Sequence, residues 1–114
     1  MSVTKYADRK RFFFVLLHMI LYNVSIIIED SNHDQLLDWL KGSLRENSYQ
    51  AKFLKMIDSP HEGTTYCIQV VADTEEVINN FQQDILADLQ AYIATSHQEK
   101  AFIFDSKMQY MSID

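Results

Sequence analysis

The feature that most constrains this chain is the apolar run Phe12–Ile28, which follows a basic cluster between Lys5 and Arg11. Such a run fits a transmembrane helix, a secretory signal, or the first strand of a soluble domain preceded by an extension. A spanning helix needs about 20 predominantly apolar residues. This run is shorter and contains His18 and Asn23. A signal needs a cleavage site with small residues, and none follows it.

The strand interpretation explains the pattern best. In "MILYNVSIIIED" (residues 19–30), apolar side chains alternate with a mixed set. Period-two alternation with one apolar face is typical of a strand whose sheet is covered on one side. The apolar face consists of Tyr22, Val24, Ile26 and Ile28, and the mixed face consists of Leu21, Asn23, Ser25 and Ile27.

The domain boundary is predicted at Met19, immediately before this strand. Residues 1–18 are then an appendage or the product of an upstream start, with a membrane-anchoring leader as the alternative, and residues 19–114 form a single domain. Residues 1–18 carry a net charge of +3, whereas the remainder has 6 basic and 15 acidic side chains, a net charge of −9. Because phosphate binding needs clustered Lys and Arg, an acidic domain argues against nucleic acid and against an anionic membrane surface.

The rest of the chain predicts two helices and three further strands. Apolar spacing of about 3.6 residues marks the helices, and the cleanest example begins at the capping residue Thr74. Its apolar stripe is Val77, Ile78, Phe81, Ile85, Leu86, Leu89, Tyr92 and Ile93. The predicted elements are a helix over 30–47, strands over 49–58 and 64–73, a long helix that begins at Thr74 and extends at least to Ile93, and a strand over 100–114 with a bulge or bend at Asp105–Ser106.

This order, β-α-β-β-α-β, predicts an α+β fold of the ferredoxin-like type. Right-handed crossovers place the first and third strands in the centre of a four-stranded antiparallel sheet, with two helices on one face. The other face is left open and carries a mixture of polar and apolar side chains, which is typical of a surface that binds a partner or lines a pocket. The predicted ligand-binding or dimer face consists of Asn23, Ser25, Ile27, Thr65, Cys67, Gln69 and Val71.

Two segments, "MILYNVSIIIEDSNHDQLLDWLK" and "KAFIFDSKMQYMSID", resemble a family of small bacterial proteins, the domain-of-unknown-function family numbered 4286. The resemblance runs from Met19 to Asp114, with "TTYCIQVV" in the place of the third strand. It implies the dimeric α+β barrel version of the ferredoxin-like fold, in which two open sheet faces pack together. It implies no activity, since the shared motifs are structural.

The sequence predicts no catalytic residue, no metal site and no cofactor. The single cysteine, Cys67, excludes a disulfide within the chain and a CxxC motif. With two glycines, the chain has no phosphate-cradling loop. The histidines at positions 18, 33, 61 and 97 are scattered, and those at 33 and 61 are expected to be solvated. A metal site from Asp58, His61 and Glu62 is conceivable but lacks a recognised spacing.

Two functions from different classes remain. The first is a non-enzymatic, cytoplasmic homodimer that senses a ligand or binds a protein. The second is a cofactor-independent monooxygenase-like enzyme with a pocket on the open face, suggested by fold analogy alone. Asn23 and Trp39 are its only plausible polar candidates, and no histidine is expected on the open face. The sequence favours the first function, with membrane contact only through residues 1–18.

Overall fold

The computed structural model describes residues 18–45 and 47–113. In these residues the chain forms strands β1 (Ile20–Ile28), β2 (Lys52–Lys55), β3 (Thr64–Ala72) and β4 (Ala101–Gln109), and helices α2 (His33–Arg45), α3 (Glu75–Phe81) and α4 (Ala87–Ser96). A 3₁₀ turn over Asp30–Asn32 leads into α2, and a π-helical segment over Gln82–Leu86 joins α3 to α4. The helix predicted over 30–47 therefore begins as a 3₁₀ turn and ends at Arg45.

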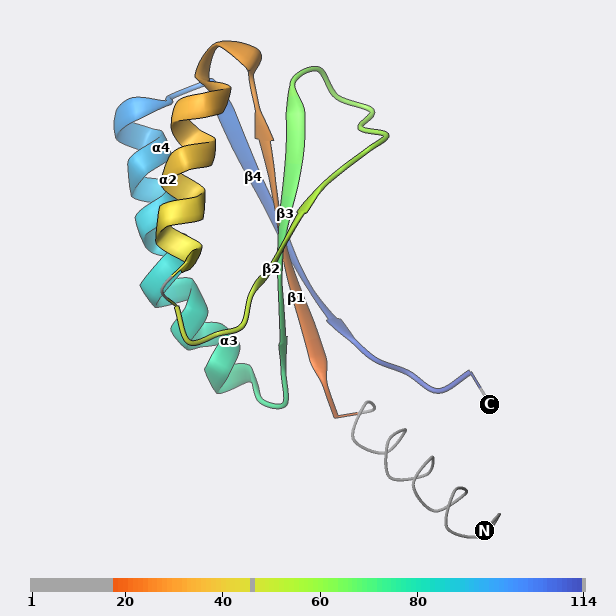
Figure 1. Cartoon of the computed structure of the whole chain (residues 1–114). Coiled ribbons are helices and arrows are strands. Elements are labelled where there is room, and N and C mark those ends of the chain that lie inside the picture. Colours follow the sequence, from red (N-terminus) through yellow and green to blue (C-terminus); the bar gives the residue numbers. More distant parts are fainter. Residues whose placement is uncertain (1–17, 46, 114) are drawn as a thin grey trace, which may run out of the picture.

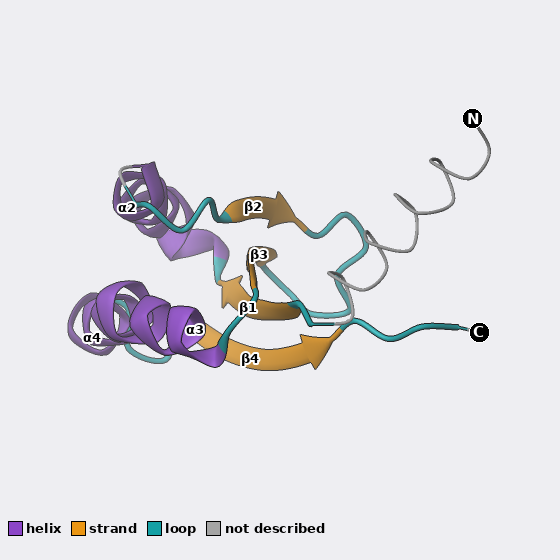
Figure 2. Ribbon diagram, turned by 90° about the horizontal axis from the view of Figure 1, so that it is seen from below, coloured by secondary structure: helices purple, strands orange, loops and turns teal. Residues whose placement is uncertain are grey.

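The sheet is antiparallel throughout, with strand order β2-β3-β1-β4. Its two most apolar strands, β1 and β3, are central, as predicted. Figures 1 and 2 show all the helices gathered on one face of the sheet. This arrangement confirms the ferredoxin-like α+β fold, and no helix in residues 18–45 and 47–113 covers the opposite face of the sheet.

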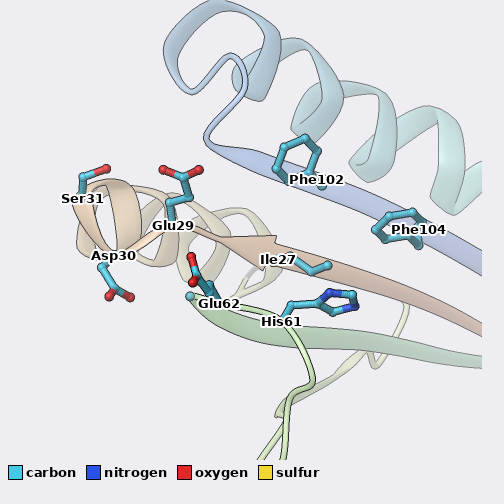
Figure 3. A pocket seen from close by; sticks show the side chains of 9 residues that line it. Ile27, Glu29, Asp30, Ser31, His61, Glu62, Phe102 and Phe104 are labelled. Atoms are coloured by element: carbon cyan, nitrogen blue, oxygen red, sulfur yellow. The ribbon is translucent and has the colours of Figure 1, made fainter.

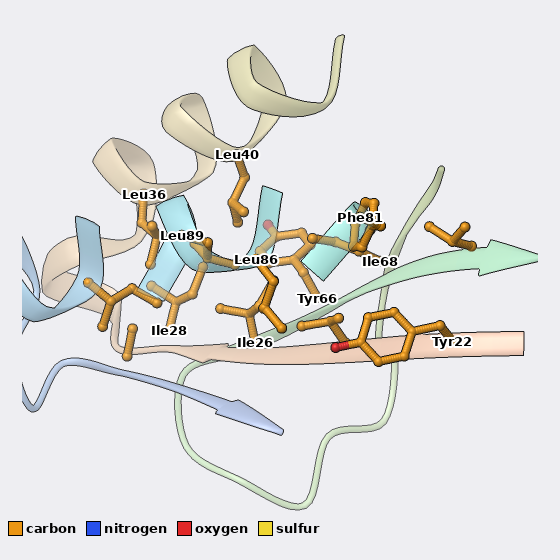
Figure 4. Packing of buried hydrophobic residues seen from close by; sticks show 14 of the residues in the cluster. Tyr22, Ile26, Ile28, Leu36, Leu40, Tyr66, Ile68, Phe81, Leu86 and Leu89 are labelled. Atoms are coloured by element: carbon orange, nitrogen blue, oxygen red, sulfur yellow. The ribbon is translucent and has the colours of Figure 1, made fainter. Parts of the chain in front are cut away.

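The core lies between the sheet and the helices (Figure 4). The apolar face of β1 is at most 1% exposed at Tyr22, Val24, Ile26 and Ile28, which confirms the predicted alternation. Burial of a large apolar side chain contributes about 1.5–3 kcal/mol before chain entropy is subtracted. The helices complete the core with Leu36, Leu40, Ile78, Phe81, Leu86, Leu89 and Ile93.

The second helix departs from a regular α-helix in its middle. Thr74 caps its start as predicted, with its side chain accepting a hydrogen bond from the Val77 amide at 3.4 Å. Residues five apart point in different directions in an α-helix, but a π turn closes at that spacing. The π segment therefore lets both Phe81 and Leu86 face the sheet, where they are 1% and 7% exposed. The sequence did not predict this segment.

The strand predicted over 49–58 is wrong in length, since β2 covers only Lys52–Lys55. Before it, Gln50 has a left-handed backbone with φ of 54°, so the chain is still turning. After it, one backbone hydrogen bond continues the pairing, from the Met56 amide to the Thr65 carbonyl at 2.8 Å. The chain then leaves the sheet and forms the β2–β3 loop.

The bulge predicted at Asp105–Ser106 is also wrong, because β4 pairs with β1 in one unbroken register from Ala101 to Gln109. The alternation only looks interrupted because polar residues occupy the covered face at this end of the strand. There the Tyr22 hydroxyl donates to an Asp105 carboxylate oxygen at 2.6 Å, and Lys107 lies 3.7 Å from Glu75.

Candidate functional site

The open face of the sheet brings together the seven residues predicted from the sequence. In the β1–β3 register, Asn23 is opposite Gln69 and Ser25 is opposite Cys67. Two further pairs extend the same face, Leu21 with Val71 and Ile27 with Thr65. Thr65 differs from the other six, since it is only 3% exposed. Its hydroxyl lies 2.9 Å from that of Ser59, in the β2–β3 loop.

The polar side chains in the centre of this face bind one another. The Gln69 amide donates to the Asn23 side-chain oxygen at 3.1 Å, and the Asn23 amide donates to the Ser25 hydroxyl at 3.0 Å. The Ser25 oxygen lies 3.5 Å from the Cys67 sulfur. We call these four residues the polar line. Because its members already satisfy part of their hydrogen-bonding capacity, covering them costs less than burying four unpaired polar groups.

Apolar side chains flank the polar line, and most of them were missed in the sequence. They are exposed by 43% at Leu54, 45% at Val71, 50% at Phe102, 60% at Phe104 and 46% at Met108. Phe102, Phe104 and Met108 lie opposite Ile27, Ser25 and Leu21 of β1, so they share its open face. The alternation "FIFDSKM" in residues 102–108 could have revealed them, because the covered face takes every second residue.

A groove with a volume of about 600 Å³ lies at one end of this face, where β1 ends and β3 begins. Figure 3 shows Ile27, Phe102 and Phe104 on the strands, with His61 and Glu62 on the loop beside them. The remaining lining comes from Glu29, Asp30, Ser31 and Gly63. A volume of this size is typical of sites for small organic ligands, which occupy about 300–1,000 Å³.

The β2–β3 loop that forms one wall of the groove is held by its own contacts. The Ser59 hydroxyl accepts a hydrogen bond from the His61 amide at 3.3 Å, in addition to its contact with Thr65. Gly63 has φ of +82°, and a Cβ atom there would lie 2.3 Å from the Ile28 carbonyl oxygen. Only glycine therefore fits this approach of the loop to the end of β1.

The histidines differ from their predicted environments. His61 and Glu62 are exposed as expected, but the loop brings His61 into the groove, beside Ile27. The prediction that no histidine reaches the open face is therefore wrong, because sequence spacing does not show how a loop folds back. His33 is half-buried rather than solvated, with its Nε2 atom 2.7 Å from the Tyr66 hydroxyl. Burial raises the pKa of that hydroxyl.

His97 is a buried polar residue that sequence reasoning missed. It is 1% exposed, with its Nδ1 atom 2.6 Å from the Asn32 side-chain nitrogen and its ring edge-on to Tyr92. Its Nε2 atom has no hydrogen-bond partner among the described residues. The residue lies in the α4–β4 connection, at the C-cap of α4, so it belongs to the helix layer and not to the open face.

Asn23 and Trp39, the candidates for the enzymatic alternative, do not form a common site. Trp39 lies on α2 and stacks on Tyr92 with ring centroids 4.7 Å apart, so it helps to join the two helices. Asn23 lies on the open face of the sheet, which the helices do not cover. Within one chain the two side chains therefore lie on different layers of the fold.

No group of three or more His, Cys, Asp or Glu side chains in residues 18–45 and 47–113 is arranged to hold a metal ion. Asp58, which the conceivable metal set included, does not line the groove. The same part of the chain contains no helix that is long and apolar enough to cross a membrane. The apolar residues before His18 lie outside the described residues.

The fold and the exposed sheet face define a class, the ferredoxin-like α+β proteins. Within that class, a family model described as "Domain of unknown function (DUF4286)" matches residues 19–111, and the chain belongs to this family. The resemblance noted in the sequence is thereby confirmed. No curated protein matches the chain.

Three solved structures illustrate the structural similarity, which at these identities concerns the fold alone. A Dabb family protein with a ferredoxin-like fold from Mesorhizobium loti has a TM-score of 0.57 at 13% identity, over 82% of this chain and 98% of that one. A dimeric protein of unknown function from Bacteroides fragilis has a TM-score of 0.57 at 10% identity, over 82% and 97%. A cofactor-independent oxygenase from Streptomyces nogalater has a TM-score of 0.52 at 6% identity, over 83% and 95%.

Proposed function

We propose that the protein is a non-enzymatic homodimer that pairs two copies through their open sheet faces and binds a ligand or a partner protein at that junction. One observation carries the proposal. Five large apolar side chains, each more than two-fifths exposed, surround the polar line on a face that none of the described helices covers. Monomeric soluble proteins rarely expose a contiguous apolar patch of this kind, and such patches mark interaction surfaces.

A second copy suits this face for a chemical reason. In a two-fold symmetric interface the same patch meets itself, so apolar flanks meet apolar flanks and the polar line lies near its symmetry mate. Donors and acceptors that remain on Asn23 and Gln69 then have polar partners across the axis. The neighbour from Bacteroides fragilis is described as dimeric, which supports dimerisation of a protein with this fold.

The experiment is light scattering after size exclusion on the full chain, with the variant Phe104→Asp. A charge placed in the middle of a desolvated apolar contact is strongly unfavourable, so the variant should run as a monomer where the wild type runs as a dimer. Phe104 is 60% exposed in the single chain, so the fold should survive. The control, Gln90→Asp, adds the same charge on the exposed side of α4 and should remain dimeric. A monomeric wild type, or a dimeric Phe104→Asp with native circular dichroism, would rule out this pairing.

The enzymatic alternative has one observation in its favour, the groove beside the open face with His61 in its wall. The oxygenase of similar fold adds an analogy of fold and nothing about residues. Trp39 stacks on Tyr92 in the helix layer, and its indole N–H can only donate a hydrogen bond. His61, whose neutral imidazole can accept a proton, is the candidate general base of this alternative. Oxygen consumption that is lost in His61→Ala and kept in His33→Ala would favour the enzyme.

We further propose that residues 19–114 form the folded domain, that residues 1–18 are an extension, and that the protein works in the bacterial cytoplasm without binding nucleic acid. The net charge of −9 over residues 19–114 supports the last point. A chain starting at Met19 should retain the number of subunits of the full chain and a circular dichroism spectrum typical of the folded domain. Recovery of the full chain in the membrane fraction of cells would contradict the cytoplasmic assignment.

A further inference from the structure

The groove at the end of the open face is a cavity with two chemically different sides. Its floor is apolar, with Ile27 of β1 beside Phe102 and Phe104 of β4, whose rings are 50% and 60% exposed (Figure 3). Its rim is polar and comes from the chain just after β1 and from the loop before β3. An apolar floor with a few convergent polar groups is the usual composition of a small-molecule site.

The charge of the rim is one-sided. Three carboxylates line the groove, those of Glu29, Asp30 and Glu62, and no lysine or arginine lines it. Glu29 is paired with Lys100 at 3.4 Å. The carboxylates of Asp30 and Glu62 are exposed, and the contacts of the described residues include no ion pair or hydrogen bond for either side chain. The cavity and its aromatic floor indicate a site for a small molecule. The carboxylates at its rim indicate that this molecule carries a positive charge.

We infer that the groove binds a small organic cation with an aromatic or compact apolar body, such as an arylalkyl ammonium compound. The body would lie on Ile27 and the phenylalanine rings, and the ammonium group would face Asp30 and Glu62. The exposed rings of Phe102 and Phe104 also favour a positively charged ligand, because an aromatic ring attracts a cation placed over its face. An anion of the same size would meet uncompensated negative charge and should be rejected.

The wall of the groove is ready for binding without a large rearrangement. Gly63 holds the loop against the end of β1, and the Ser59 contacts fix the backbone at His61. A site formed before the ligand arrives loses less entropy on binding. This inference rests on the proposed homodimer in one respect, since the sheet of the second copy would cover the open side above Phe102 and Phe104.

The test uses three probes of similar size and different charge: phenethylamine, phenethyl alcohol and phenylpropionate. Each is titrated into the full-length protein at neutral pH while the aromatic signals of Phe102 and Phe104 are followed by nuclear magnetic resonance. Phenethylamine should bind most tightly, the alcohol less tightly, and phenylpropionate least. The double variant Asp30→Asn/Glu62→Gln should weaken binding of the amine by about two- to thirtyfold, since it removes two exposed charge contacts that contribute about 0.2–1 kcal/mol each.

The matched control is Glu76→Gln/Asp88→Asn, which removes two exposed carboxylates from the helix layer and changes the net charge equally. It should leave amine binding unchanged. Two results would overturn the inference: phenylpropionate binding as tightly as the amine, or equal weakening of the amine by both double variants. The second result would mean that net charge, and not the groove, attracts the cation.

The solution mass of the same samples separates this inference from the proposed assembly. A dimer that shows no preference for the amine overturns the ligand class and leaves the homodimer intact. A monomer that prefers the amine through Asp30 and Glu62 overturns the homodimer and supports the ligand class.

Discussion

The two glycines of the chain should respond to the same substitution with opposite signs. Gly63 has φ of +82°, and the Cβ atom of Gly63→Ala would lie 2.3 Å from the Ile28 carbonyl oxygen and 3.0 Å from its carbon. Both contacts are with backbone, so no side-chain rotation can relieve them. Gly42, in the exposed surface of α2, has nothing within 4 Å of a Cβ atom.

The size of each effect follows from these surroundings. An L-residue in a left-handed conformation costs about 1–2 kcal/mol, and moving the loop away from β1 adds the loss of its contacts. We therefore expect Gly63→Ala to lower the free energy of unfolding by about 2 kcal/mol or more, even after the gain from a stiffer unfolded chain. Gly42→Ala should raise it by about 0.5–1 kcal/mol, because alanine is the better helix former.

Urea unfolding, followed by the fluorescence of the single tryptophan Trp39, measures both variants in one assay. All samples need the same protein concentration, since the stability of a dimer depends on it. The expected separation between the two variants is about 3 kcal/mol. If Gly63→Ala were as stable as the wild type, the close approach of the loop to β1 would be refuted, and with it the fixed wall of the groove.

The remaining predictions concern the buried tyrosine of β1 and the thiol of the polar line. Tyr22→Phe should cost about 1–2 kcal/mol, because it removes the hydrogen bond to Asp105, whereas Tyr110→Phe, in the exposed chain after β4, should cost nothing measurable in the same urea assay. Burial, together with the hydrogen bond to Asp105, raises the pKa of Tyr22 to about 12. The folded state therefore holds this proton more tightly than the unfolded chain, whose tyrosine pKa is about 10. The contribution of this proton to the free energy of unfolding is complete below pH 10 and is lost as the pH rises towards 12. Tyr22→Phe should not show this decrease in stability between pH 10 and 12. Cys67 should react with a maleimide several-fold more slowly in the wild type than in Phe104→Asp, since the proposed second sheet covers it; equal rates would contradict that cover.

The covered half of the fold was predictable because its sequence signals agree with one another. Tyr22, Val24, Ile26 and Ile28 alternate with a single period, and the apolar residues from Val77 to Ile93 recur at a spacing close to that of a helix, with the π segment bringing Phe81 and Leu86 to the same side. Burial against one layer imposes both patterns, so they predict which faces of the strands and helices are covered. The rule of right-handed crossovers then gives the order of the strands in the sheet.

The parts that could not be predicted depend on contacts between distant segments. In the sequence, Asp105 and Lys107 suggest a bulge because polar residues are unexpected on the covered face. Their partners, Tyr22 and Glu75, come from distant parts of the chain, which local sequence does not reveal. The position of His61 depends on how the β2–β3 loop folds over the end of β1, which local propensity does not encode. The open-face residues of β4 were missed because the polar residues Asp105 and Lys107 on the covered face interrupt the apolar signal of the strand.

The polar groups on the two faces of the sheet differ in where their hydrogen-bond partners lie. On the covered face, Tyr22 receives a hydrogen bond from Gln82 and donates one to Asp105, and Tyr66 is paired with His33. On the open face, the polar line is satisfied only within itself and is surrounded by exposed apolar side chains. Water solvates the apolar part of this surface poorly. A purely apolar partner would leave the remaining hydrogen-bond donors of the polar line without acceptors. A surface of the same composition meets both requirements, which supports the proposal that a second copy of this chain covers the open face.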